Sequence, residues 1–112
     1  MNVPGIVRKY HEAFIVAENG DLPTTIQFAV DDGNVCALPY AYLVAIEFNR
    51  SGAITIEFTS RKVELKGRRL EKLFASLVHY QVISIRQHSI TDVRPPAGEC
   101  CIDGLVITAN ED

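Results

Sequence analysis

Five apolar residues in the second half of the chain recur at the spacing of one face of an α-helix. The spacing is i, i+3, i+4, i+7 and i+8, and the residues are Leu70, Leu73, Phe74, Leu77 and Val78. This pattern predicts one amphipathic helix at about residues 68–80, with an apolar stripe roughly 100° wide. Such a stripe has to be buried, so we expect the rest of the chain to supply a β-layer against which it packs.

The segments on both sides of this helix alternate with a period of two, which is typical of β-strands. The clearest is residues 53–59, where Ile54, Ile56 and Phe58 share one face. Pro39 has no N–H for a strand ladder, so it predicts an edge, a bulge or a break in the sheet. The same reasoning predicts further strands at residues 26–30, 35–38, 42–48, 63–65, 82–85 and 102–107.

The first 20 residues support two interpretations. Apolar residues from Val3 to Ala17 recur at helical spacing, and Pro4 suits the first turn of a helix, where its missing N–H costs nothing. Residues 13–17 also resemble a short buried strand that ends at the turn signal Asn19-Gly20. Between the two we favour a short N-terminal helix within residues 4–17.

The expected fold class is therefore α+β: a small, mostly antiparallel sheet with meander connections, packed against one amphipathic helix. A chain of 112 residues has the size of one domain. No linker, repeat or low-complexity tract divides it, so residues 1–112 are expected to form a single compact domain.

The same features bear on cellular location. No stretch approaches the roughly 18 apolar residues of a membrane-spanning helix, and residues 1–9 lack the apolar region of a secretory signal. The three cysteines, Cys36, Cys100 and Cys101, cannot all pair within one chain, which fits a reducing compartment. We expect a cytoplasmic protein without membrane contact.

One segment of the chain departs from its overall acidity. The net charge of −3 argues against a protein that coats nucleic acid along its whole surface, but residues 61–72 carry six basic and two acidic side chains. A phosphate ligand or a nucleic-acid backbone is a candidate partner for such a segment. A solvated surface explains the same charges, and no aromatic residue lies among them to stack on bases. The candidate anion-binding residues are Lys62, Lys66, Arg68, Arg69 and Lys72.

A second candidate surface lies around Pro39. If residues 38–43 are extended, Tyr40 and Tyr42 point to the same side, beside a proline that opens the edge of the sheet. Pro39, Tyr40 and Tyr42 are therefore a candidate partner surface. The alternative is structural, with the two rings closing one end of the core and keeping their hydroxyl groups wet.

His88, Cys100 and Cys101 are the remaining candidates for chemistry. Thiolates and imidazole bind zinc, and a Cys–His pair can act as nucleophile and base. Adjacent cysteines, however, lack the two-residue spacing of structural zinc sites, and the chain contains no nucleophile-elbow, dinucleotide, phosphate-loop or His-Glu-x-x-His motif. The sequence therefore predicts no metal, no cofactor and no catalytic residue.

Three hypotheses for function follow. The leading one is a small non-catalytic binding or regulatory module that self-associates as a dimer, because apolar residues make up 47% of a chain too small to bury all of its apolar surface. A protein partner fits the same reasoning. The second hypothesis is binding of phosphate ligands or nucleic acid through residues 61–72. The third is a small enzyme or metal protein that uses His88, Cys100 and Cys101.

Overall fold

The computed structural model describes residues 12–18, 20–89, 93 and 95–110. Within these ranges the chain forms eight strands, one short 3-10 helix and one α-helix. The elements in chain order are β1 (Phe14–Val16), β2 (Thr25–Ala29), β3 (Val35–Pro39), η1 (Tyr40–Tyr42), β4 (Leu43–Phe48), β5 (Ile54–Phe58), β6 (Arg61–Arg68), α1 (Glu71–Val78), β7 (Val82–Arg86) and β8 (Cys101–Ala109).

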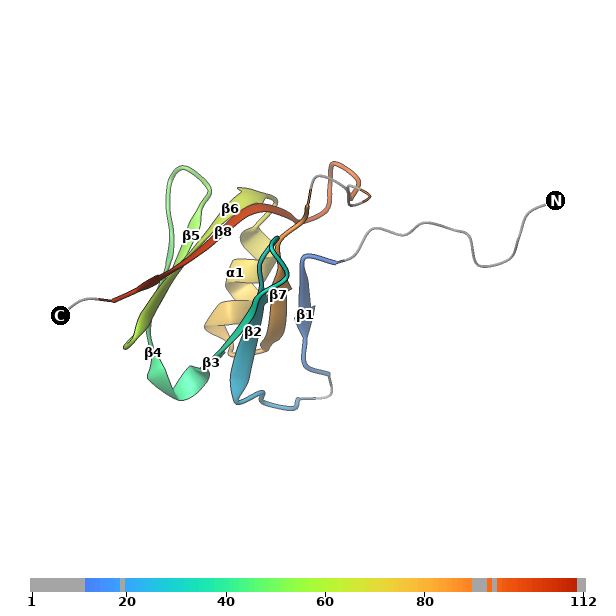
Figure 1. Ribbon diagram of the computed structural model, residues 1–112. Helices are drawn as coiled ribbons and strands as arrows, with labels where there is room; N and C mark the ends of the chain where they lie inside the picture. The colour runs from blue at the N-terminus through green and yellow to red at the C-terminus, as the bar shows by residue number, and fades with distance from the viewer. Residues whose placement is uncertain (1–11, 19, 90–92, 94, 111–112) are drawn as a thin grey trace.

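The strands make two four-stranded sheets with α1 packed on both (Figure 1). Sheet A has the order β1-β7-β2-β3, and sheet B has the order β4-β5-β6-β8. All pairs are antiparallel except β2 with β7, which is parallel. Helix α1 contacts β7 in sheet A and β4 in sheet B. The predicted α+β class, with a small and mostly antiparallel sheet packed against a helix, is confirmed.

The division into two sheets differs from the single sheet expected from sequence. It occurs at Pro39, where β3 ends and the 3-10 turn Tyr40–Tyr42 carries the chain into β4 of the other sheet. Pro39 cannot donate to a strand ladder, and its φ of −75° suits the entry to a turn. The proline thus marks a change of sheet, which is one of the breaks that its chemistry predicts.

The preference for an N-terminal helix is wrong where the structure describes that region. Residues 14–16 form strand β1, which pairs antiparallel with β7 through Phe14 with Ile85 and Ile15 with Ser84. β-branched residues suit a pleated, half-buried strand, and a distant partner strand outweighs helical spacing over so few residues. Residues 4–11 of the expected helix lie outside the described residues.

Helix α1 is shorter than the predicted residues 68–80. Arg68 belongs to β6, and Arg69 has a left-handed φ of 57°, so the helix begins only at Glu71. At its other end, Tyr80 has a φ of 58° and donates its N–H to the carbonyl of Leu77, which ends the helix.

The apolar side of α1 supplies part of the core. Leu70, Leu73 and Leu77 are buried, and Phe74 packs on Phe48 with ring centroids 5.3 Å apart. Val78, the fifth member of the predicted stripe, is the last residue of α1 and is 50% exposed.

Buried side chains from both sheets and α1 form one continuous cluster. Phe28 of sheet A meets Phe58 of sheet B edge to face at a centroid distance of 6.2 Å, and both are fully buried. This contact joins the two sheets directly. No helix in the described ranges is long and apolar enough to cross a membrane.

Candidate functional site

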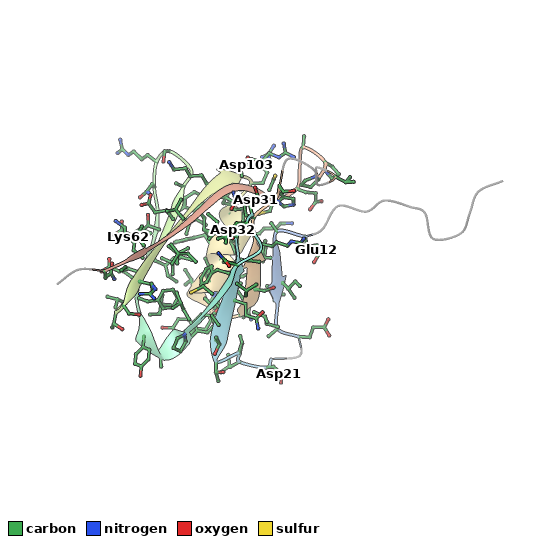
Figure 2. The ribbon with its side chains drawn as sticks, viewed as in Figure 1. Glu12, Asp21, Asp31, Asp32, Lys62 and Asp103 are labelled. Carbon is green, nitrogen blue, oxygen red and sulfur yellow. The ribbon has the colours of Figure 1, made fainter. Side chains whose placement is uncertain are left out.

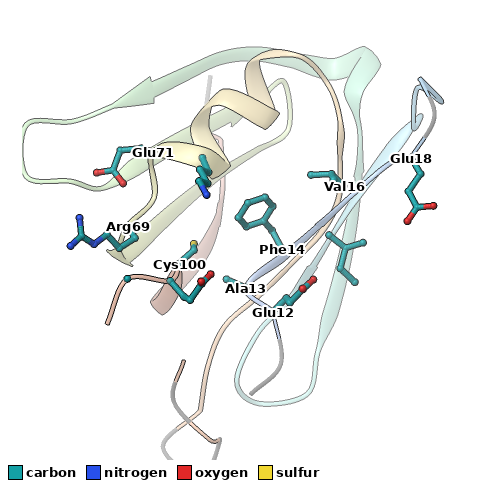
Figure 3. A pocket seen from close by; sticks show the side chains of 12 residues that line it. Glu12, Ala13, Phe14, Val16, Glu18, Arg69, Glu71 and Cys100 are labelled. Carbon is teal, nitrogen blue, oxygen red and sulfur yellow. The ribbon is translucent and has the colours of Figure 1, made fainter. Parts of the chain in front are cut away.

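A cavity of about 580 Å³ lies between strand β1, the start of α1 and the loop that precedes β8 (Figure 3). We call it the β1 cavity. Its volume falls within the range of pockets that bind small molecules or peptide segments. It is lined by Glu12, Ala13, Phe14, Ile15, Val16 and Glu18 from β1 and its flanks, Arg69, Glu71 and Lys72 from the start of α1, and Gly98, Glu99 and Cys100 from the loop.

Among the described residues, strand β1 is one edge of sheet A, and its backbone groups alternate between β7 and the side that no other described strand pairs with. Arg86 donates its N–H to the carbonyl of Ala13, and Ala17 donates its N–H to the carbonyl of Gln81. Ala13 and Ala17 therefore face β7, and the alternation of an antiparallel ladder turns the N–H and C=O groups of Phe14 and Val16 to the other side. No β7 residue lines the β1 cavity, so the cavity borders the free side of β1.

The opposite wall is the start of α1. The left-handed backbone of Arg69 turns the chain sharply from β6 into the helix, and no side chain caps the first backbone N–H groups. Phe14 points from β1 toward this wall (Figure 3). The close approach of β1 and α1 thus depends on the turn at Arg69.

The charges of the β1 cavity are mainly acidic. Its lining includes four carboxylates and two cations, which leaves a formal charge of −2. The carboxylates belong to Glu12, Glu18, Glu71 and Glu99, and the cations to Arg69 and Lys72. Such a lining favours a cationic ligand over an anionic one.

The structure divides the five candidate anion-binding residues among three places. Lys62 and Lys66 are exposed on the outer face of sheet B, where Lys62 lies opposite Glu57 in the strand register. Arg68 donates from its guanidinium to the carbonyl of Pro95 at 2.7 Å. Only Arg69 and Lys72 line the β1 cavity.

Figure 2 shows Lys62 on the side of sheet B, away from Glu12 at the β1 cavity. These cations are close in sequence but lie apart in the structure, because the turn at Arg69 separates β6 from α1 and the two elements run in different directions. The five cations do not share one concave surface.

Pro39, Tyr40 and Tyr42 do not form the shared surface expected of an extended segment. Residues 40–42 form a 3-10 turn, in which Tyr40 is 5% exposed and Tyr42 is 58% exposed. Tyr40 stacks on Tyr80 at 4.8 Å and donates its hydroxyl to the carbonyl of Val82 at 2.7 Å. Burial raises the pKa of Tyr40 to about 12. Tyr40 therefore closes one end of the core, as in the structural alternative, and Tyr42 alone projects outward.

His88, Cys100 and Cys101 come from neighbouring segments. His88 is buried, and its ring Nδ1 accepts a hydrogen bond from the backbone N–H of Ile102 at 3.3 Å. The backbone N–H of His88 donates to the carbonyl of Ile102 at 2.8 Å. The Sγ of the buried Cys101 lies 3.5 Å from Oδ1 of Asp103. Within the described part of the chain, no three His, Cys, Asp or Glu side chains are grouped as metal ligands. The two hydrogen bonds between His88 and Ile102 join the segment that follows β7 to the start of β8.

Cys100 lies in the β1 cavity as a thiol. Burial is the largest cause that raises its pKa to about 12, and the negative charges of Cys101, Glu71 and Glu99 add to it. Only a thiolate is a strong nucleophile, and an ordinary cysteine has a pKa of about 8.5 to 9.0. Cys100 is therefore protonated at neutral pH and unsuited to nucleophilic catalysis.

We expect Cys100 to react with iodoacetamide roughly 1000-fold more slowly in the folded protein than in the urea-unfolded chain at pH 8, because three pKa units separate about 12 from 9.0. Mass spectrometry of timed samples, digested and read at the Cys100 peptide, measures the two rates. The folded rate should still be rising with pH at pH 10, where that of an ordinary thiol has levelled off. A plateau below pH 9 would contradict the assignment.

Sequence patterns did not identify the β1 cavity. Its lining comes from three segments that are distant along the chain, and β1 matches the strand alternative for residues 13–17 rather than the favoured helix. The signal that could have indicated it is the run Phe14-Ile15-Val16 between the two carboxylates Glu12 and Glu18.

No family model matches this chain, and neither the curated proteins nor the solved structures with which it was compared include a match.

Proposed function

We propose that this chain is a non-catalytic binding module that holds an extended segment of a partner protein along the free edge of β1. The observation that carries the proposal is the position of the β1 cavity beside the outward N–H and C=O groups of Phe14 and Val16. An extended peptide can add to a sheet edge through such groups, so that backbone hydrogen bonds supply affinity and the surrounding side chains select the sequence.

The chemistry of the cavity indicates the composition of the bound segment. Phe14 and Val16 offer apolar contacts, and four carboxylates against two cations favour Lys or Arg in the ligand. The preferred segment is therefore apolar with basic residues. Phosphate ligands and nucleic acid have less support, because four carboxylates and only two cations line the cavity.

A catalytic role also has less support. The protonated Cys100 is a weak nucleophile, and Nδ1 of His88 is occupied by the backbone of Ile102. Neither group is arranged to activate a substrate in the β1 cavity. Binding therefore accounts for more of the observed geometry than catalysis does.

The test is selection of binders from a displayed library of seven-residue peptides, followed by titration of the best peptide against variants at Val16. Val16→Pro removes an N–H that faces the cavity and leaves the ladder to β7 intact, so we expect binding to weaken about tenfold. Val16→Ala keeps the N–H and should bind within about threefold of the native protein. Selected peptides should contain more Lys and Arg than Asp and Glu.

Amide NMR spectra verify that both variants are folded and locate the bound peptide. Shifts centred on β1 and the start of α1 are the expected result. Equal affinity of the native protein and Val16→Pro would contradict the proposal, as would shifts confined to Lys62, Lys66 and the outer face of sheet B.

A further inference from the structure

In the described part of the chain, the two sheets end in four edge strands: β1, β3, β4 and β8. Strand β1 borders the β1 cavity, and β4 contains a register shift and the charged Glu47. The start of β8 is occupied, since Gln87 donates to the carbonyl of Asp103 and His88 donates to the carbonyl of Ile102. Short length, bulges, charges and covering groups are the usual protections of a sheet edge.

Strand β3 is free of these protections along its whole length. It has five residues, none of them charged, and it pairs with β2 in a continuous register without a bulge. Val35 is 61% exposed, and no strand in the described part of the chain pairs with the outer side of β3. Only Pro39, at its end, interrupts the donors of this edge.

The hydrogen bonds around β3 identify which backbone groups are free. Tyr40 donates to the carbonyl of Thr24, and Val30 donates to the carbonyl of Asn34. Both bonds belong to the same antiparallel register between β2 and β3. The backbone N–H and C=O groups of even-numbered residues of β3 therefore face β2, and those of odd-numbered residues face outward. The outward groups are the N–H and C=O of Val35 and Ala37. The C=O of Pro39, the N-cap residue of η1, accepts the first hydrogen bond of that turn.

We propose that β3 pairs antiparallel with β3 of a second copy of this chain, about a two-fold axis at Ala37. The two Ala37 residues exchange a pair of N–H···O=C bonds at the axis. Each Val35 lies opposite the partner's Pro39, so the missing N–H of Pro39 falls at the end of the contact. Sheet A of one copy and sheet A of the other then form one continuous sheet of eight strands.

Symmetry favours a second copy as the occupant, and β3 lacks the charges that would oppose it. The chain has a net charge of −3, so two copies repel each other over most surfaces, but β3 carries no charge. Apolar residues meet across the axis, Val35 with the partner's Pro39 and Cys36 with the partner's Leu38. A two-fold contact uses the same patch on both copies and closes at the dimer.

The contact is small, so we expect a reversible dimer with a dissociation constant on the order of 10 µM or weaker. Sedimentation of the full chain from about 1 µM to about 1 mM should show a monomer converting to a dimer. Ala37→Pro removes both N–H donors at the axis without touching the ladder to β2, and should weaken the dimer about 30-fold.

A matched pair of lysine variants separates the edge from the face of the sheet. Ala37→Lys places two ammonium groups opposite each other at the axis and should abolish the dimer, because like charges directly across strands repel. Gln27→Lys adds the same charge on β2, opposite Ala37 in the register but one strand away from the axis, and should leave most of the dimer intact.

A native chain that stays monomeric at about 1 mM overturns the proposal, as does a dimer that neither Ala37→Pro nor Ala37→Lys weakens. Assembly beyond a dimer also overturns it, because a two-fold β3 pair leaves no second β3 edge. Strands β1 and β3 are opposite edges of sheet A, so the outcome is independent of peptide binding at the β1 cavity.

Discussion

Replacement of Gly67 by alanine should destabilise the protein by at least about 3 kcal/mol, the upper part of the range for overpacking in an interior. A Cβ at Gly67 would overlap the carbonyl oxygen of Cys101 on β8. The position of the Cβ is set by the backbone of residue 67, and the oxygen belongs to the backbone of Cys101. Neither atom can therefore rotate away as the end of a long side chain would. The strands come this close because the β6–β8 register shifts between Lys66 and Gly67. Urea denaturation measures the change in free energy of unfolding.

Gly104→Ala is the control for Gly67→Ala. Gly104 lies on the adjacent strand β8, opposite Lys66, and an added Cβ would be 3.5 Å from Cβ of Lys66, an ordinary contact. Its effect should stay within about 1 kcal/mol. If the two variants unfold at the same urea concentration, the close approach of β6 to β8 at Gly67 is incorrect.

Phe28→Ala should cost about 3–5 kcal/mol, the range for removing a buried aromatic ring. Phe28 is fully buried and packs on Phe58 of the other sheet, so its loss opens a cavity where sheets A and B meet. That cost is a large part of the 5–15 kcal/mol by which domains are usually stable. Urea unfolding followed by circular dichroism measures it.

Val106→Ala serves as the comparison for Phe28→Ala, because Val106 is 55% exposed on β8. It should change stability by no more than about 0.5 kcal/mol. In a double-mutant cycle, Phe28→Ala with Phe58→Ala should cost less than the sum of the single changes, because the two rings contact each other. Strict additivity would argue against this contact between the sheets.

Most strands could be predicted from local alternation. Residues 54–58 of β5 have Ile54, Ile56 and Phe58 buried and Glu57 exposed, as the sequence pattern indicates. Strands β2, β3, β7 and β8 also overlap their predicted ranges. The period of two reports which side of a strand faces the core, and that information is contained within five or six residues.

The candidate sites could be predicted far less well. The basic residues from Lys62 to Lys72 are adjacent in sequence, but Lys62 lies on the outer face of sheet B and Lys72 at the β1 cavity. Tyr40 and Tyr42 have opposite exposures because a 3-10 turn replaces the expected extended segment. In both cases one or two backbone dihedrals, at Arg69 and around Pro39, redirect the side chains that follow.

The sequence by itself determined the α+β class, the approximate positions of most strands and the buried apolar residues Leu73 and Leu77 of α1, with Leu70 just before it. Only the tertiary structure decided that the strands form two sheets, that residues 14–16 form a strand, and that β1, the start of α1 and the loop before β8 enclose a cavity. The physical reason is that periodicity records the burial of neighbouring side chains, whereas sheet partners and cavity walls depend on free energies of contact between segments far apart in the chain.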